Sequence, residues 1–146
     1  MASTNEPGSE DMMIAARHTD GILFAQRAAQ ADGLFCAACG IVMALGGDGL
    51  ASWAGLASSL PLFILGIGLI VYGAALIGLA RAYPGHVRLT QTILVLNLLW
   101  VIGSIPILVF NPFRLTSGAL VALLVIGLAV GGFALWQNAA LRRLRA

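Results

Sequence analysis

The sequence predicts an all-α integral membrane protein, a four-helix bundle with up-down-up-down topology and both termini in the cytoplasm. Three observations support this prediction. Hydrophobic residues make up 60% of the chain and charged residues only 10%, against about 45–50% and about 25% in an ordinary soluble domain. The apolar residues fall into four long runs separated by short polar segments. Arginines gather on one side of these runs.

The apolar runs predict membrane-spanning helices. About 20 apolar residues cross the hydrocarbon core of a bilayer as an α-helix, which satisfies every backbone polar group within the segment. The first run is the shortest, because its purely apolar part covers only residues 33–45. A tilt or a local thinning of the bilayer can absorb the shortfall. The expected spans are residues 28–45, 60–80, 89–110 and 117–136.

An alternative for the first span is a longer helix that begins near Glu10 and lies partly in the interface before it enters the membrane. The ends of the other spans follow ordinary helix chemistry. Ser58-Ser59 can cap the second span, and Tyr83-Pro84-Gly85 ends it because proline cannot continue a helix. Asn111-Pro112 closes the third span and Thr116-Ser117 can cap the fourth. Short connections of this kind predict antiparallel neighbours.

The chain divides into a tail and one transmembrane domain. Residues 1–21 are expected to form a polar, partly disordered tail, and residues 22–146 the four-helix domain. The tail carries four of the six acidic residues and lacks the cationic start and apolar middle of a signal peptide. Its first nine residues are too polar to offset the entropy lost on ordering.

Arginine placement predicts the orientation. Seven of the eight arginines lie on one side of the four predicted spans, and only Arg114 lies on the other. Cytoplasmic loops collect arginine, so both termini and the loop with His86 are expected in the cytoplasm. The expected location is the bacterial inner membrane, with the lipid bilayer as the main partner. Nucleic acid is excluded as a partner, because no basic face gathers enough cations to bind phosphates.

Polar residues inside the spans form a candidate site. Each polar group in lipid is costly unless it has a partner. Tyr72 and Asn97 each lie eight residues from the cytoplasmic end of their spans, or about 12 Å deep. We expect a polar cluster in the cytoplasmic leaflet, with Arg81 near its rim. The cluster is either a set of interhelical hydrogen bonds that fixes packing or a small pocket for a headgroup, a quinone ring or a proton. Its members are Asp32, Tyr72, Asn97 and Gln137.

The sequence Cys36-Ala37-Ala38-Cys39 contains a C-x-x-C motif, a spacing typical of thiol–disulfide exchange. Its apolar surroundings disfavour the thiolate, and no second pair of cysteines is present to pass electrons onward. Small packing residues are therefore the favoured interpretation. His18 and His86 stand apart, so no metal site is expected. No catalytic motif is evident, and neither enzymatic activity nor a cofactor is expected.

Small residues recur on three of the spans at spacings that let helix backbones approach closely in lipid. They are interpreted as packing faces within one bundle, with a docking face for another membrane protein as the alternative. These candidate faces comprise Gly33, Ala37 and Gly40 in the first span, Ala74 and Gly78 in the second, and Gly127 and Gly131 in the fourth.

From about Ala28 to Arg143 the chain resembles small four-span bacterial membrane proteins of uncharacterised function. Asp32-Gly33, the run from Asn97 to Ser104 and the run from Phe133 to Gln137 carry the likeness. The resemblance implies the four-span count and no activity.

Three functions are weighed on this basis. The leading one is a non-enzymatic accessory or assembly subunit that packs against other membrane proteins or against its own copies. The second is a small binder or carrier of a lipid, a quinone or another hydrophobic molecule. The third is a membrane thiol oxidoreductase that uses Cys36 and Cys39.

Overall fold

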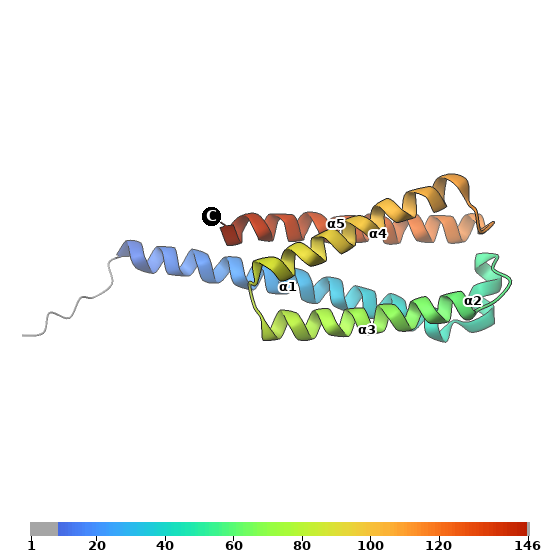
Figure 1. Ribbon diagram of the computed structural model, residues 1–146, viewed down its shortest axis with the longest axis horizontal. Coiled ribbons are helices and arrows are strands. Elements are labelled where there is room, and N and C mark those ends of the chain that lie inside the picture. Colours follow the sequence, from blue (N-terminus) through green and yellow to red (C-terminus); the bar gives the residue numbers. More distant parts are fainter. Residues whose placement is uncertain (1–8, 146) are drawn as a thin grey trace, which may run out of the picture.

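The computed structural model describes residues 9–145, and these residues are helical apart from short connections (Figure 1). Four of the helices are long and apolar enough to cross a membrane. The expected set of four long apolar helices is thereby confirmed, and a short helix that the sequence did not indicate is added. The elements are α1 (Ser9–Leu45), α2 (Gly47–Ala54), α3 (Leu60–Ala82), α4 (Val87–Phe110) and α5 (Ser117–Arg145).

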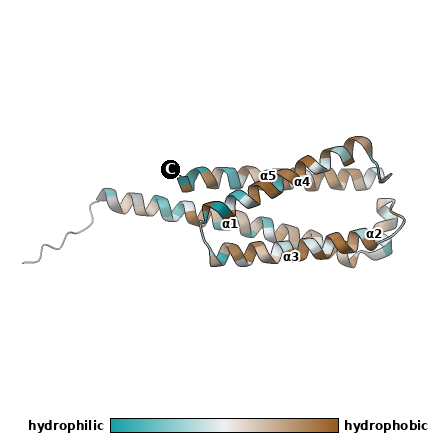
Figure 2. Ribbon diagram, viewed as in Figure 1, coloured by the Kyte–Doolittle hydropathy of each residue, from teal (hydrophilic) through white to brown (hydrophobic). Residues whose placement is uncertain are grey.

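Hydropathy follows the length of the helices. Figure 2 shows apolar residues along the long helices, with hydrophilic residues gathered in the first part of α1 and at the end of α5. Large apolar side chains such as Val42, Leu99 and Leu128 are mostly exposed on the outside of the bundle. A soluble protein rarely exposes apolar patches of this extent, whereas a lipid-facing surface consists of them.

The first helix is longer than the span predicted over residues 28–45. It begins at Ser9 and continues without a break to Leu45, as in the alternative with a start near Glu10. Alanine, glutamine, arginine and methionine are frequent in residues 10–30 and all favour the helix, so nothing stops it there. Residues 9–21 of the predicted tail are therefore helical, whereas the disorder expected before Ser9 falls outside the described residues.

The long helices form two pairs. Helix α1 packs along α3, and α4 packs along α5, while α1 and α5 join the pairs (Figure 1). Over the described residues, the backbones of α3 and α4 do not approach each other closely, although Leu76 and Ala80 of α3 and Ile93 of α4 belong to one buried cluster with Ala29 of α1. Figure 1 shows α2 and the turn before α5 at one end of the bundle, with the turn between α3 and α4 and the end of α5 at the other.

Glycines allow the close approach of α1 and α3. A Cβ added at Gly33 would lie 2.7 Å from the carbonyl oxygen of Gly73, and one added at Gly40 would lie 2.5 Å from that of Gly66. A Cβ at Gly73 would in turn meet the backbone of Gly33 and the amide nitrogen of Ala37. Backbone atoms cannot move aside as a flexible side chain can. The two helices therefore share an antiparallel glycine seam, formed by Gly33 and Gly40 on α1 and by Gly66 and Gly73 on α3.

The other candidate packing faces point elsewhere. Ala74 is exposed, and a Cβ added at Gly78, Gly127 or Gly131 would have no atom within 4 Å. The small residues of α1 thus lie in a close helix contact within the chain. Those predicted on α3 and α5 border open space in this chain.

Short connections close the bundle with the residues that the sequence indicated. Asn111 takes a left-handed conformation with φ 43° at the end of α4, and its side-chain oxygen accepts a hydrogen bond from the Leu115 amide at 2.6 Å. Thr116 caps α5 by accepting from the Ala119 amide and donates to the Trp53 carbonyl of α2 at 2.8 Å. The turn before α5 is therefore tied to α2.

Candidate functional site

Three helices bring one carboxyl group and two carboxamides together in the interior. Asn97 Nδ2 of α4 donates to Asp32 Oδ2 of α1 at 2.7 Å, and Gln137 Nε2 of α5 donates to the same oxygen at 2.8 Å. Asn97 Nδ2 also lies 3.2 Å from Gln137 Oε1. The exposed fractions are 0% for Asp32, 4% for Asn97 and 1% for Gln137. We call these three residues the polar centre.

The partners of Asp32 are neutral groups. Its second oxygen, Oδ1, lies 3.7 Å from the Cys36 thiol one helical turn later, a weak donor. The strong donors to Asp32 are two side-chain amides from other helices rather than an arginine or a histidine. Arg81, expected near the rim, is exposed. The carboxyl group is thus held by hydrogen bonds that cross between helices, which satisfy a polar group that lipid cannot.

The local sequence explains how one helix serves two neighbours. On α1 the seam residues Gly33 and Gly40 face α3, whereas Asp32 and Cys36, one turn apart, face the other helix pair. Positions four apart in an α-helix lie on the same face. The polar centre therefore joins the α1–α3 pair to the α4–α5 pair.

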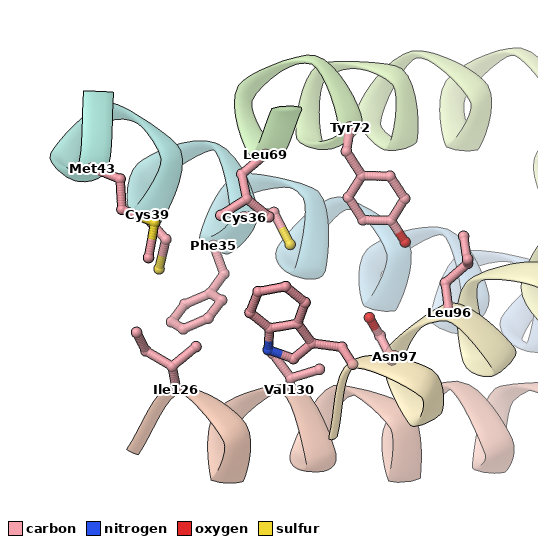
Figure 3. A pocket seen from close by; sticks show the side chains of 11 residues that line it. Phe35, Cys36, Cys39, Met43, Leu69, Tyr72, Leu96, Asn97, Ile126 and Val130 are labelled. Carbon is pink, nitrogen blue, oxygen red and sulfur yellow. The ribbon is translucent and has the colours of Figure 1, made fainter. Parts of the chain in front are cut away.

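A cavity of about 260 Å³ lies beside the polar centre, with walls from all four long helices (Figure 3). Its lining is largely apolar and aromatic, and none of the lining residues is charged. The lining includes Cys36 and Cys39 from α1, Tyr72 from α3, Asn97 and Trp100 from α4, and Val130 from α5. Asn97 belongs to both the polar centre and the cavity wall.

Two polar atoms of the cavity-lining residues lack a partner. The Tyr72 hydroxyl and the Trp100 indole nitrogen are buried and make no hydrogen bond to any described residue. Figure 3 shows the Tyr72 hydroxyl and the side-chain oxygen of Asn97 pointing toward each other across the cavity. Buried polar groups are nearly always paired. The unpaired groups of Tyr72 and Trp100 are therefore candidate contacts for a bound molecule.

The structure thus brings together three of the four residues predicted for the intramembrane cluster. Asp32, Asn97 and Gln137 are hydrogen-bonded. Tyr72 stands on the opposite wall of the cavity and takes no part in that network. The agreement in depth between Tyr72 and Asn97 places both at one cavity rather than in one set of hydrogen bonds.

The two cysteines are free thiols on the same wall of the cavity. Cys36 is buried and Cys39 is partly buried. In this position they act as small residues that leave space, in addition to the contact from Cys36 to Asp32. Among the described residues, no group of three or more histidine, cysteine or acidic side chains is placed to hold a metal ion.

Sequence reasoning missed Gly66, Gly73 and Trp100. The two glycines of α3 carry a signal that could have found them, because Gly66 and Gly73 have the same seven-residue spacing as Gly33 and Gly40. Trp100 had no such signal, since tryptophan within an apolar run is compatible with lipid contact as well as with burial. The cavity itself depends on how the pairs are set against each other, which no local pattern encodes.

Comparisons of this chain with protein-family models, with curated proteins and with solved structures find no match. The site must therefore be interpreted from its own chemistry.

Proposed function

We propose that this protein is a non-enzymatic, multi-pass protein of the bacterial inner membrane that binds a small hydrophobic molecule with a polar head. One observation carries the proposal, namely an apolar cavity whose wall contains buried polar atoms without partners, from Tyr72 and Trp100. Ligand sites are typically apolar pockets with a few placed polar groups. The hydrogen-bonding groups would orient the head, and the apolar walls would hold the rest.

The volume limits the size of the bound part. Drug-sized ligands occupy pockets of about 300–1,000 Å³, whereas benzene fits an engineered apolar cavity of about 150 Å³. The cavity here measures about 260 Å³. It accommodates a ring-sized head or a short branched group, so a longer molecule would leave its tail outside.

Access from the bilayer fits the arrangement of the helices. The cavity is lined by both α3 and α4, two sequential helices whose backbones do not approach each other closely over the described residues. A tail passing between them would lie among the lipid chains. The bound molecule would then exchange with the membrane without crossing water.

We further propose an up-down-up-down bundle with both termini in the cytoplasm. The distribution of arginines supports this orientation, since Arg81, Arg88 and the group at the end of α5 would then lie on the inner face. The polar centre would then lie in the half of the membrane nearer the cytoplasm, and the cavity would extend from it through the middle of the bilayer. The resemblance to small four-span bacterial proteins remains part of this proposal.

The test is to fill the cavity. Cys39→Phe adds a ring to the cavity wall without touching the polar centre, and Ala38→Phe adds the same ring to an exposed position of α1. Both variants and the native chain are extracted in mild detergent and measured by native mass spectrometry. We expect a small molecule to be retained by the native chain and by Ala38→Phe, and to be lost from Cys39→Phe.

Retention of the same molecule by Cys39→Phe would contradict the proposal, because the cavity could not then be its site. Native chain that carries nothing, in membranes and in detergent alike, would contradict it as well. Equal melting temperatures for the two variants would show that neither result comes from misfolding.

A second candidate function is an accessory subunit that packs against another membrane protein. The open space at Gly78, Gly127 and Gly131 favours it, because small residues without a neighbour allow a second helix to approach closely. Leucine at Gly131 would occupy the space that such a helix needs. Loss of a co-purifying protein from the Gly131→Leu variant, with the cavity ligand retained, would support this function.

A further inference from the structure

We propose that the cavity selects a neutral aromatic alcohol, a phenol-type head joined to an apolar tail. This inference rests on the proposed binding function and narrows it to one ligand chemistry. It depends on the donor and acceptor that face each other across the cavity, on the flat walls, and on the absence of charge from the lining.

Asn97 presents a fixed acceptor to the cavity. Both hydrogen bonds of its side chain use Nδ2, one to Asp32 and one to Gln137. The amide cannot turn over without losing these bonds, so its oxygen stays directed at the Tyr72 side (Figure 3). The polar centre therefore has a positioning role, since it holds Asn97 with the acceptor toward the ligand.

Tyr72 supplies the complementary donor. Its hydroxyl faces the Asn97 oxygen but makes no hydrogen bond to it or to any other described residue. A hydroxyl group placed between the two can accept from Tyr72 and donate to Asn97 at once. A carbonyl or ether oxygen can accept from Tyr72 only, which leaves the Asn97 oxygen unpaired. An alcohol can therefore satisfy both the Tyr72 hydroxyl and the Asn97 oxygen.

The surrounding walls favour an aromatic carrier for that hydroxyl. Phe35 and Trp100 line the cavity together with Tyr72, and aromatic rings pack on one another in stacked or edge-to-face geometry. The volume of about 260 Å³ holds one substituted ring. A sugar or a branched polyol would leave several polar groups against apolar walls, at a cost for each.

The lining also disfavours anionic heads. No lining residue is a cation, and the acidic group nearest the cavity, Asp32, accepts hydrogen bonds from the two amides through Oδ2. An anionic phosphate or a carboxylate would leave water without gaining a partner of opposite charge. A neutral head avoids this penalty.

The experiment uses a matched series of probes with one tail. Native chain in phosphatidylcholine nanodiscs is titrated with 4-octylphenol, 4-octylanisole and octylbenzene, and bound probe is measured against empty nanodiscs. The phenol can donate and accept, the anisole can only accept, and the benzene can do neither. With affinities expressed per mole fraction in lipid, we expect each lost hydrogen bond to weaken binding about two- to tenfold.

Variants identify the residues. Tyr72→Phe removes the hydroxyl and keeps the ring, and Tyr83→Phe makes the same change at an exposed tyrosine outside the cavity. We expect Tyr72→Phe to weaken 4-octylphenol about two- to tenfold and leave octylbenzene unchanged. Tyr83→Phe should change neither probe. Unchanged octylbenzene binding also shows that the cavity of the variant is intact.

The outcomes separate this inference from the proposed function. Equal binding of the three probes, or equal phenol binding by Tyr72→Phe and native chain, would overturn the choice of an aromatic alcohol and leave a site that selects by size. Failure of all three probes to bind above empty nanodiscs would overturn both proposals.

Discussion

Asp32, Asn97 and Gln137 show how a membrane protein keeps a carboxyl group inside. Each residue would be costly alone in lipid, and each is satisfied by a partner from another helix. The three residues could be predicted from the sequence because a polar residue within an apolar span is unfavourable unless it has a hydrogen-bonding partner. Tyr72 was predicted by the same reasoning. Its side chain suits either the hydrogen-bond network or a cavity wall, and the structure places it in the cavity wall.

Removal of Gln137 tests the structural part of this picture. Gln137→Leu keeps a similar volume but removes one donor to Asp32 and the contact with Asn97. We expect a loss of about 0.6–2 kcal/mol in the free energy of unfolding. Unfolding in a denaturing detergent titration measures it. Asn138→Leu changes the next residue, which has no hydrogen bond to the polar centre, and an equal loss there would refute the assignment.

Helix faces were the hardest feature to read from the sequence. Leucine and isoleucine are as stable against lipid as against another helix, so apolar periodicity does not mark the buried side in a membrane as it does in water. On α1 the crowding of Gly33, Ala37 and Gly40 marked the contact face. On α3 the pair Ala74 and Gly78 fitted the short-spacing pattern as well as Gly66 and Gly73 fitted the longer one, and the structure uses the latter.

The seam between α1 and α3 can be tested with single methyl groups. Gly73→Ala places a Cβ against the backbone of Gly33 and Ala37, and Gly68→Ala places one in open space on the same helix. We expect the first change to lower the unfolding free energy by about 1–3 kcal/mol, as overpacking does.

The control change should be neutral or stabilising by up to about 1 kcal/mol, because alanine favours a helix more than glycine. Thermal loss of helicity in detergent measures both variants. A Gly73→Ala variant as stable as Gly68→Ala would mean that the two helices are farther apart than described.

At the scale of the whole molecule, hydropathy and glycine, proline and asparagine signals were enough to predict four long helices and both ends of α3 and α4 to within two residues. Helix α5 continues to Arg145, nine residues beyond the expected end at residue 136. They were not enough to predict the pairing of the helices, in which the backbones of α3 and α4 do not approach each other closely. The pairing depends on many apolar contacts of similar energy, which no local sequence pattern distinguishes. The cavity depends on the pairing, so the sequence could not predict it either.

Orientation is a prediction for intact cells. In a background with Cys36→Ala and Cys39→Ala, single cysteines at the exposed positions Ala57 and Ala82 report the two ends of the bundle. A membrane-impermeant maleimide should label Ala57→Cys from outside. It should label Ala82→Cys only after the cells are opened. The reverse pattern would invert the proposed topology.

The first part of α1 has a consequence for how the chain meets its surroundings. Residues 12, 13 and 15–20 all have exposed side chains, whereas Gly21 is buried against the end of α5, beside Arg143. An isolated peptide of about a dozen residues is a marginal helix in water, because the first turn is costly to form. Here the membrane-anchored remainder of α1 serves as a preformed nucleus, so this segment can fray and rewind without nucleating anew. A surface that docks on this segment would therefore bind a helix without the free-energy cost of nucleating it, because the membrane-embedded part of α1 already forms the nucleus.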